Sequence, residues 1–511
     1  LSKFFEDPLP KEIIEEYQLM NFNDAIAQVH FPESDELLDA ARHRLGFQEL
    51  LLIQLRVLNR KKLWREMAEN RKESLVMDKK CVQSFLDRLP YKLTGAQTRS
   101  LNEILIDMSG SLPMSRLLEG DVGSGKTVVA AAAAYMALMS GHQVLMMVPT
   151  EILAKQHFET MYGYLKDCGF NIQLLVGSLT KTQKEQLVND LKNGVIDFVI
   201  GTHAIIQDNV HFRNLGLAII DEQHRFGVSQ RAFIKQFGTP HTLSMTATPI
   251  PRTLALTLYG DQDLSIIDEM PPGRQEIITR VVPENKRDGA YEWIKDQVLK
   301  GRQAFIVCPL IEESEVLEVK SAVNEYERLS HEVFSEFKLG LLHGRLKQSE
   351  KDEIMELFSL KKINILVSTT VIEVGIDVPN ATIMVVEAAD RFGLAQLHQL
   401  RGRVGRGEFQ SYCFLFLEGD SEIVRQRMSA MVENSDGFKL AEIDLSLRGP
   451  GEVYGIRQSG IPDLKMASLS DRKLVQVARE AAEKIMALNL RLDAFFELSR
   501  YIDAEEVVID Y

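Results

Sequence analysis

The chain has 511 residues, of which 45% are hydrophobic and 26% charged, and its formal net charge is −14. A chain of this length exceeds what one hydrophobic core usually supports, so we expect two or three domains. No segment approaches the run of about 20 apolar residues that a membrane span needs. The negative charge gives no support to nucleic-acid binding over the whole surface, so any contact with nucleic acid is expected to be local, in a lined groove.

The chain begins at Leu1 without an initiator methionine, and it lacks the basic start and apolar core of a secretory signal. We therefore expect a piece of a longer protein. The cysteines Cys81, Cys168, Cys308 and Cys413 lie far apart, which argues against a zinc site and against a disulfide framework. A reducing cytoplasm is the predicted location.

Residues 1–88 show helical spacing and no strand signal, with helices expected over 10–20 and 34–70. A packing or linker element is the favoured interpretation. Basic residues cluster between 56 and 65, where a solvated helix face and a contact with phosphates explain them equally well.

From residue 89 onward, short apolar strands alternate with helices, which is typical of parallel sheets. The first expected domain, 89–272, has strands over 116–118, 143–148, 172–176, 198–201, 217–220 and 242–246. After the turn signal Pro271-Pro272-Gly273, the second domain, 273–431, has strands over 277–282, 304–307, 341–342, 363–368, 382–386 and 412–417. The tail, 432–511, is mixed, with a helix over 471–492 that can brace it against the second domain. The predicted fold class is α/β, with two tandem doubly wound parallel-sheet domains, an N-terminal helical segment and a C-terminal mixed tail.

The segment Gly120–Thr127 fits G-x-x-x-x-G-K-[ST] and lies between an apolar strand and an alanine-rich helix. This arrangement is typical of a loop that binds the phosphates of a nucleoside triphosphate. Lys126 can neutralise the β- and γ-phosphates, and the Thr127 hydroxyl can bind Mg²⁺. The predicted cofactors are ATP and Mg²⁺, and the predicted loop contacts are Gly120, Gly123, Ser124, Gly125, Lys126 and Thr127.

A buried strand over 217–220 runs directly into the carboxylates Asp221 and Glu222. Strands of a parallel sheet deliver such residues to the edge where the phosphate loop lies. Asp221 can hold Mg²⁺, and Glu222 can orient and deprotonate the attacking water. Taken alone, the pair is equally consistent with a cap or a turn.

Two further features do not belong to a simple NTPase. Arg401, Arg403 and Arg406 crowd a glycine-punctuated turn that can present guanidinium groups to a phosphate chain held by a facing domain. A solvated basic turn is the alternative. Upstream, the amide of Gln97 can both donate and accept, as the edge of adenine requires.

An ordered series of motifs resembles the set of superfamily 2 helicases, and it runs through Leu93-Thr94-x-x-Gln97, Gly120–Thr127, Val148-Pro149-Thr150, Gly201-Thr202-His203, Asp221–His224, Thr246-Ala247-Thr248, His343-Gly344-Arg345, Thr369–Pro379 and Gln399–Arg406. The stretches 221–228 and 396–407 resemble the branch formed by the RecG family and the transcription-repair coupling factors. The stretch 443–460 is similar to the translocation motif of that branch. Residues 30–32 and 41–51 look like the helical segment that precedes the RecG motor, without the oligonucleotide-binding wedge that comes before it.

The resemblance implies two RecA-like domains with ATP between them. It implies ATP contacts by Leu93, Gln97, Gly375 and Asp377 and catalytic roles for Lys126, Glu222, Arg403 and Arg406. It implies DNA contacts by Thr150, Gln156, Thr202, His203, Thr369, Thr370, Arg448 and Gln458. Ordinary helix capping explains the threonines equally well when each is taken alone.

The function implied is an ATP-dependent translocase on branched duplex DNA, such as replication forks and four-way junctions, in repair and recombination. The expected chain is a monomer near the bacterial nucleoid, without a membrane partner and with single-stranded DNA-binding protein as a candidate partner. Junction splitting is not expected without the wedge, whereas the motor should be intact. The alternatives are a transcription-repair coupling motor, an RNA-remodelling helicase and a catalytically idle scaffold.

Overall fold

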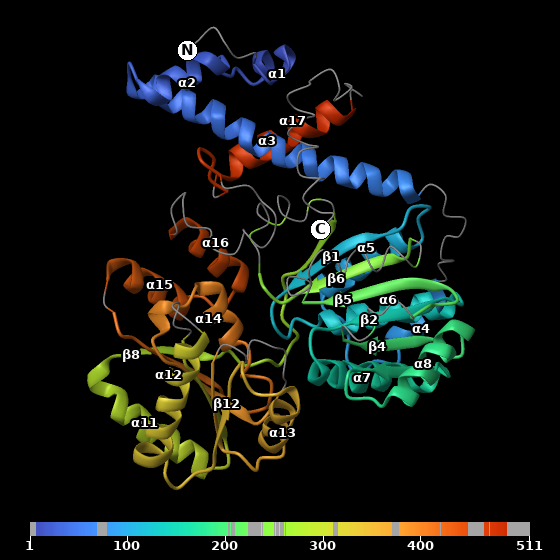
Figure 1. Cartoon of the computed structure of the whole chain (residues 1–511), viewed down its shortest axis with the longest axis vertical. Coiled ribbons are helices and arrows are strands. Elements are labelled where there is room, and N and C mark those ends of the chain that lie inside the picture. Colours follow the sequence, from blue (N-terminus) through green and yellow to red (C-terminus); the bar gives the residue numbers. More distant parts are fainter. Residues whose placement is uncertain are drawn as a thin grey trace. The chain divides into compact units, whose positions relative to one another are not determined.

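Figure 1 shows the computed structural model, which describes residues 7–68, 79–202, 205, 210–222, 237, 239–249, 251, 255, 260, 262–309, 315–369, 378–419, 421–447, 464–469 and 471–487. The chain forms two compact units. One unit comprises 1–70, 250–263 and 445–511, and the other comprises 71–249 and 264–444. None of the helices within these described ranges is long and apolar enough to cross a membrane.

Within the described residues, the first sheet of the larger unit has seven strands in the order β3-β4-β2-β5-β6-β1-β7. The strands are β1 (Ser115–Gly120), β2 (Gln143–Met147), β3 (Ile172–Leu175), β4 (Phe198–Gly201), β5 (Leu215–Asp221), β6 (His241–Thr246) and β7 (Asp263–Ile267). The neighbours from β3 to β1 all pair in parallel. All but β7 were predicted. The run that forms β7 is only five residues long, and its polar–apolar alternation extends over just four of them, too short a signal to mark a strand.

The helices of this domain are α4 (Lys79–Leu86), α5 (Gly95–Met108), α6 (Lys126–Met139), α7 (Glu151–Leu165) and α8 (Lys181–Asn193). Helix α6 carries the run Ala130–Ala134, in which every residue is fully buried. Small side chains suit this position because α6 contacts α4, α5, α7 and the strands β1, β2 and β5. The helix after the phosphate loop is thus held rigidly in the core.

The second sheet, as far as the structure describes it, has six parallel strands in the order β10-β11-β9-β12-β13-β8. They are β8 (Ile278–Val282), β9 (Gln303–Val307), β10 (Leu339–Leu342), β11 (Ile365–Ser368), β12 (Ala381–Val386) and β13 (Tyr412–Phe416). The helices are α11 (Arg287–Leu299), α12 (Glu315–Arg328), α13 (Gln348–Ser359), α14 (Leu394–Arg401), α15 (Glu422–Glu433) and α16 (Gly437–Leu447). The predicted fold class, with two doubly wound α/β domains in tandem, is confirmed.

The smaller unit joins the two ends of the chain. Its helices are α1 (Lys11–Glu16), α2 (Phe22–His30), α3 (Asp35–Ala68) and α17 (Arg472–Ala487). Phe47, Leu50 and Leu51 of α3 share one core with Ala478 and Ala482 of α17. The sequence pattern predicts these helices as separate elements and favours a C-terminal helix that braces the tail against the second domain, but the described packing partner of α17 is α3.

The segment before α17 is also fixed to α3. The Glu49 carboxylate accepts hydrogen bonds from the backbone N–H groups of Lys465, Met466 and Ala467, at 2.9–3.2 Å. A Cβ added at Gly46 would lie 3.3 Å from the Ala467 Cα. Glycine at position 46 therefore permits the close approach of the two segments.

Candidate active site

The phosphate loop begins at the last residue of β1 and extends into the first turn of α6, so it lies between a strand and a helix as the motif predicted. Gly123 and Gly125 have φ of 81° and 88°, values that glycine adopts without strain. The Lys126 Nζ donates to the carbonyl oxygens of Gly120 (2.6 Å) and Asp121 (2.9 Å). The lysine therefore lies over its own loop, at the N-terminus of a 14-residue helix where anions are favoured.

The charges around Lys126 come from three elements. Burial lowers the pKa of Lys126, and the carboxylates of Glu222, Asp221 and Asp121 oppose that shift. Arg406, from the second domain, lowers the pKa further. The loop lysine thus lies within electrostatic reach of both predicted acidic residues and of one predicted arginine finger.

The acidic pair lies at the end of β5, as predicted. Asp221 Oδ2 forms a 2.8 Å hydrogen bond with the Nε2 of His157 on α7, and Asp221 Oδ1 accepts the Glu222 N–H at 3.1 Å. Burial tends to raise the pKa of Asp221, but the His157 hydrogen bond and the Lys126 charge outweigh it and hold that pKa below its ordinary value. A carboxylate kept ionised in this way suits the predicted metal ligand.

Glu222 has φ of 54°, a left-handed conformation that side chains other than glycine rarely adopt. A strained backbone conformation persists only where the surrounding contacts hold it in place, and such conformations are concentrated at functional sites. No motif in the sequence marks His157. It lies on α7, which packs beside β3 and β4, and it reaches the end of β5 through its bond to Asp221.

Gln97 connects the start of α5 to the phosphate loop. Its Oε1 accepts the Thr94 N–H at 2.9 Å as part of a capping box, and its Nε2 donates to the Ser124 carbonyl at 2.8 Å. The adjacent Ala96 N–H donates to the Glu269 carboxylate at 3.0 Å. Because a side-chain amide offers four hydrogen-bonding sites, these contacts leave capacity for the predicted contact with adenine.

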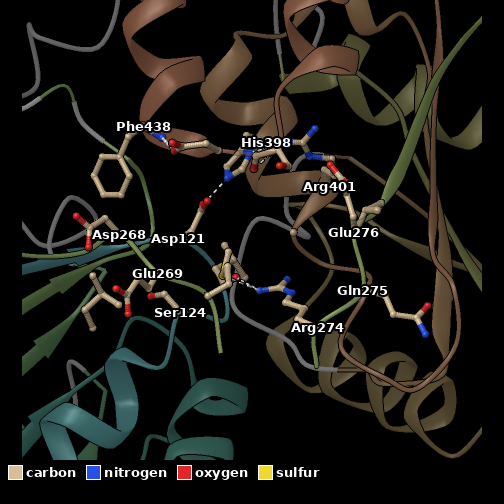
Figure 2. Close-up of a pocket in the computed structure, with 17 residues that line it drawn as sticks. Asp121, Ser124, Asp268, Glu269, Arg274, Gln275, Glu276, His398, Arg401 and Phe438 are labelled. Carbon is tan, nitrogen blue, oxygen red and sulfur yellow. Dashed lines mark hydrogen bonds and ion pairs between the residues drawn. The ribbon is translucent and has the colours of Figure 1, made fainter. Parts of the chain in front are cut away.

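A second cluster joins the loop to helix α14 (Figure 2). Asp121 Oδ1 is hydrogen-bonded to the His398 Nε2, and Arg401 Nη2 lies 2.8 Å from the His398 Nδ1. Because arginine can only donate, the His398 Nδ1 accepts from Arg401. The His398 Nε2 therefore carries the hydrogen and donates it in the hydrogen bond to Asp121. Asp121 Oδ2 also accepts the Gly437 N–H at 3.2 Å. Burial raises the pKa of Asp121, but His398 and Gly437 bring it below its ordinary value.

Arg401 fixes the segment that leads into α16. Its guanidinium donates to the carbonyls of Met431 (2.8 Å), Asn434 (3.0 Å) and Ser435 (3.3 Å). A Cβ at Gly437 would meet His398 Nε2 and Pro249 Cγ, each at 2.5 Å. The start of α16 is therefore packed directly against the loop and α14, a contact that the motifs did not predict.

A cavity of about 410 Å³ opens beside the loop, which is the usual size range of a small-molecule site (Figure 2). It is lined by the loop at Asp121, Val122 and Ser124, by the segments 267–270 and 274–277, by His398, Arg401 and Gly402, and by Ser435, Asp436 and Phe438. The two α/β domains thus both contribute to its wall.

The other predicted residues are placed as follows. Thr150 is the N-cap of α7 and accepts the Leu153 N–H at 3.4 Å, which is the alternative interpretation given above. Thr202 and Thr369 follow β4 and β11 and are buried, and Arg403 is buried after α14. Gln156 lies on α7, Leu93 packs beside the first core, and Thr127 is the second residue of α6. His203, Thr370, Gly375, Asp377, Arg448 and Gln458 lie outside the described residues.

Comparison with known proteins first defines the class. Residues 94–257 match the family model of DEAD/DEAH box helicases, and residues 287–408 match the helicase conserved C-terminal domain. These ranges contain the phosphate loop with its acidic pair and the arginine turn, respectively. The chain is therefore built as a two-domain helicase motor.

The particular family follows from the tail and from whole relatives. Residues 434–494 match domain 3, C-terminal, of the ATP-dependent DNA helicase RecG. The chain is 50% identical to ATP-dependent DNA helicase RecG of Synechocystis sp. over 96% of this chain and 59% of that protein. It is 46% identical to the RecG of Bacillus subtilis over 97% of this chain and 72% of that protein. The chain belongs to the RecG family of ATP-dependent DNA helicases.

A solved structure of RecG bound to a three-way DNA junction is similar to this chain, with a TM-score of 0.79 and 47% identity. The similarity covers 94% of this chain and 62% of that one. This chain thus spans about three fifths of the length of the Synechocystis relative and of the junction-bound structure. The predicted resemblance to the RecG family is confirmed.

Proposed function

We propose that this chain is an ATP-driven motor that translocates on duplex DNA at branch points. The observation that carries the proposal is the convergence on Lys126 of Asp121, Asp221 and Glu222 from the first domain and Arg406 from the second. A site completed from two domains can couple the nucleotide cycle to domain movement. The junction-bound relative supports branched DNA as the substrate.

The residues suit hydrolysis of a triphosphate. The loop glycines allow backbone N–H groups to face the phosphates, Lys126 supplies a charge, and Glu222 is placed to orient and deprotonate the attacking water. Thr127 and the ionised Asp221 would hold Mg²⁺, which neutralises phosphate charge when it is bound. Arg406, with Arg403, would stabilise the charge that develops in the transition state.

The predicted DNA contacts are with phosphates and not with bases, so DNA binding should be independent of base sequence. Helix N-termini such as that of α7 favour a phosphate beside Thr150. The proposed outcome of translocation is reversal of stalled forks and migration of four-way junctions during repair and recombination. A monomer, association with the bacterial nucleoid and a partnership with single-stranded DNA-binding protein belong to the same proposal.

The test is the steady-state ATPase rate measured without nucleic acid and with single strand, duplex, fork, four-way junction and RNA. We expect the largest stimulation by the fork and the junction. Equal stimulation by RNA would favour an RNA-remodelling helicase, and no hydrolysis under any condition would favour a scaffold. A Lys126→Ala variant controls for a contaminating ATPase.

A further inference from the structure

The segment that links the two α/β domains passes beside the phosphate loop. It runs from the end of β7 through Pro271-Pro272-Gly273 to β8, and Arg274 is its first residue after the turn. The Arg274 Nη1 donates to the carbonyl oxygen of Val122, in the middle of the loop (Figure 2). A Cβ added at Gly123 would overlap the same guanidinium. Arg274 lies outside every motif named above.

The hydrogen bond from Arg274 to the Val122 carbonyl fixes the orientation of the whole Val122–Gly123 peptide. A trans peptide is planar, and its C=O and N–H point in opposite directions. The Val122 carbonyl and the Gly123 N–H belong to one such plane, so a guanidinium that holds the carbonyl also sets the direction of the N–H. In a phosphate loop these backbone N–H groups are the anion donors. Arg274 therefore acts on the part of the loop that meets the nucleotide.

The surroundings hold Arg274 in this position. Its Nη1 lies 3.6 Å from the Met270 Sδ, and the guanidinium forms part of the wall of the 410 Å³ cavity. A Cβ at Gly402 would lie 3.0 Å from the Val122 Cβ. Val122 thus contacts the interdomain segment through its carbonyl and the turn after α14 through its side chain. Because the guanidinium group of arginine is always charged and presents its N–H donors in a rigid plane, it can hold a carbonyl in one orientation.

We propose that Arg274 is a positioning residue of the ATP site. It holds the Val122–Gly123 peptide in the orientation that binds phosphate. Because Arg274 belongs to the segment that joins the domains, it makes nucleotide affinity depend on their arrangement. This inference rests on the proposed function, since it concerns the same ATP site.

Two variants test it. Arg274→Met keeps the apolar stem and removes the donors, and Arg274→Ala removes both. Arg280→Met, on the exposed face of β8, is the control for the change in charge. The dissociation constants of ATP, ADP and GTP are measured at low and high salt, together with the melting temperature and the kcat and KM of ATP hydrolysis.

We expect both Arg274 variants to weaken the binding of ATP, ADP and GTP alike by about 10- to 150-fold, the range for a lost hydrogen bond of a charged group. The loss should persist at high salt, because it reflects the geometry of the loop and not a screened attraction. KM should rise more than kcat falls, and the melting temperature and the Arg280→Met control should change little.

Unchanged affinities in both Arg274 variants would overturn the inference while leaving the proposed function intact. A loss confined to ATP and ADP, with GTP unaffected, would indicate a contact with adenine and also overturn it. A loss of nucleotide affinity that vanishes at high salt would also overturn the inference, because it would show that Arg274 acts through charge attraction and not through the geometry of the loop. If the unaltered protein binds no nucleotide, the proposed function itself fails.

Discussion

The hydrogen bond between Asp121 and His398 should couple the phosphate loop energetically to the second domain. The two side chains are only 10% and 7% exposed, and the His398 tautomer is set by the Arg401 donor. A buried hydrogen bond to a charged group contributes about 1.5–3 kcal/mol, which corresponds to roughly 10- to 150-fold in an equilibrium constant. In Asp121, His398 and Gly437 donate to different oxygens. Asn at position 121 keeps the shape but replaces one of these oxygens by an NH2 group, which cannot accept from the donor that faces it.

The assay is a double-mutant cycle on the DNA-stimulated ATPase, with Asp121→Asn, His398→Ala and the pair. Each single change should lower kcat/KM by about 10- to 100-fold, and the double variant should lose little more than the worse single one. The coupling free energy should therefore be about 1.5–3 kcal/mol. Strictly additive losses, with a coupling below about 0.5 kcal/mol, would refute the reasoning.

The pH dependence of this cycle has a definite sign. The folded pKa of Asp121 lies below its ordinary value, so its contribution is present above the unfolded pKa and is lost only as pH falls through the folded value. The coupling should consequently be flat between about pH 6 and pH 8. A coupling that disappears within that range would show that Asp121 is not the charged partner.

The remaining predictions concern the chemistry, the DNA and the second domain. Lys126→Ala should abolish hydrolysis, whereas Glu222→Gln should bind ATP and turn over roughly 10²- to 10⁴-fold more slowly; a rate within about threefold of the unaltered protein would remove Glu222 as the base. Arg406→Ala should lower kcat by up to about 10³-fold with little effect on ATP affinity, as equilibrium binding and single-turnover rates would show. DNA affinity should be indifferent to sequence and fall steeply with salt in a titration, and salt-independent binding would contradict phosphate contacts. Burial raises the pKa of Glu387 to about 7 from its ordinary 4.5 despite the nearby Arg287, so stability should fall by about 3 kcal/mol as pH rises from 4.5 to 7; Glu387→Gln should flatten the melting temperature over that range, and an unchanged slope would contradict the assignment.

Periodicity and length were sufficient for most of the fold. Buried parallel strands such as β2 and β12 are continuous apolar runs between turn signals, and they lie within a residue or so of their predicted bounds. The shared core of α3 and α17 could not be predicted in the same way. It joins residues more than 400 positions apart, and neither helix alone shows which distant segment packs against it.

The phosphate loop shows why part of the site was predictable and part was not. A motif marks the positions that meet the ligand, because glycine, lysine and threonine are the residue types that phosphate chemistry demands. Asp121 and Val122 occupy two of its unspecified positions. Asp121 accepts from His398 and Gly437, and the Val122 carbonyl accepts from Arg274. These partners suit this chain's second domain and linker, so no pattern common to all phosphate loops can contain them. The specified positions of the motif thus contact the nucleotide, whereas Asp121 and Val122 contact the second domain and the interdomain segment. Changes at Asp121 and Arg274 therefore test the coupling between the loop and these parts, whereas a change at Lys126 tests only hydrolysis.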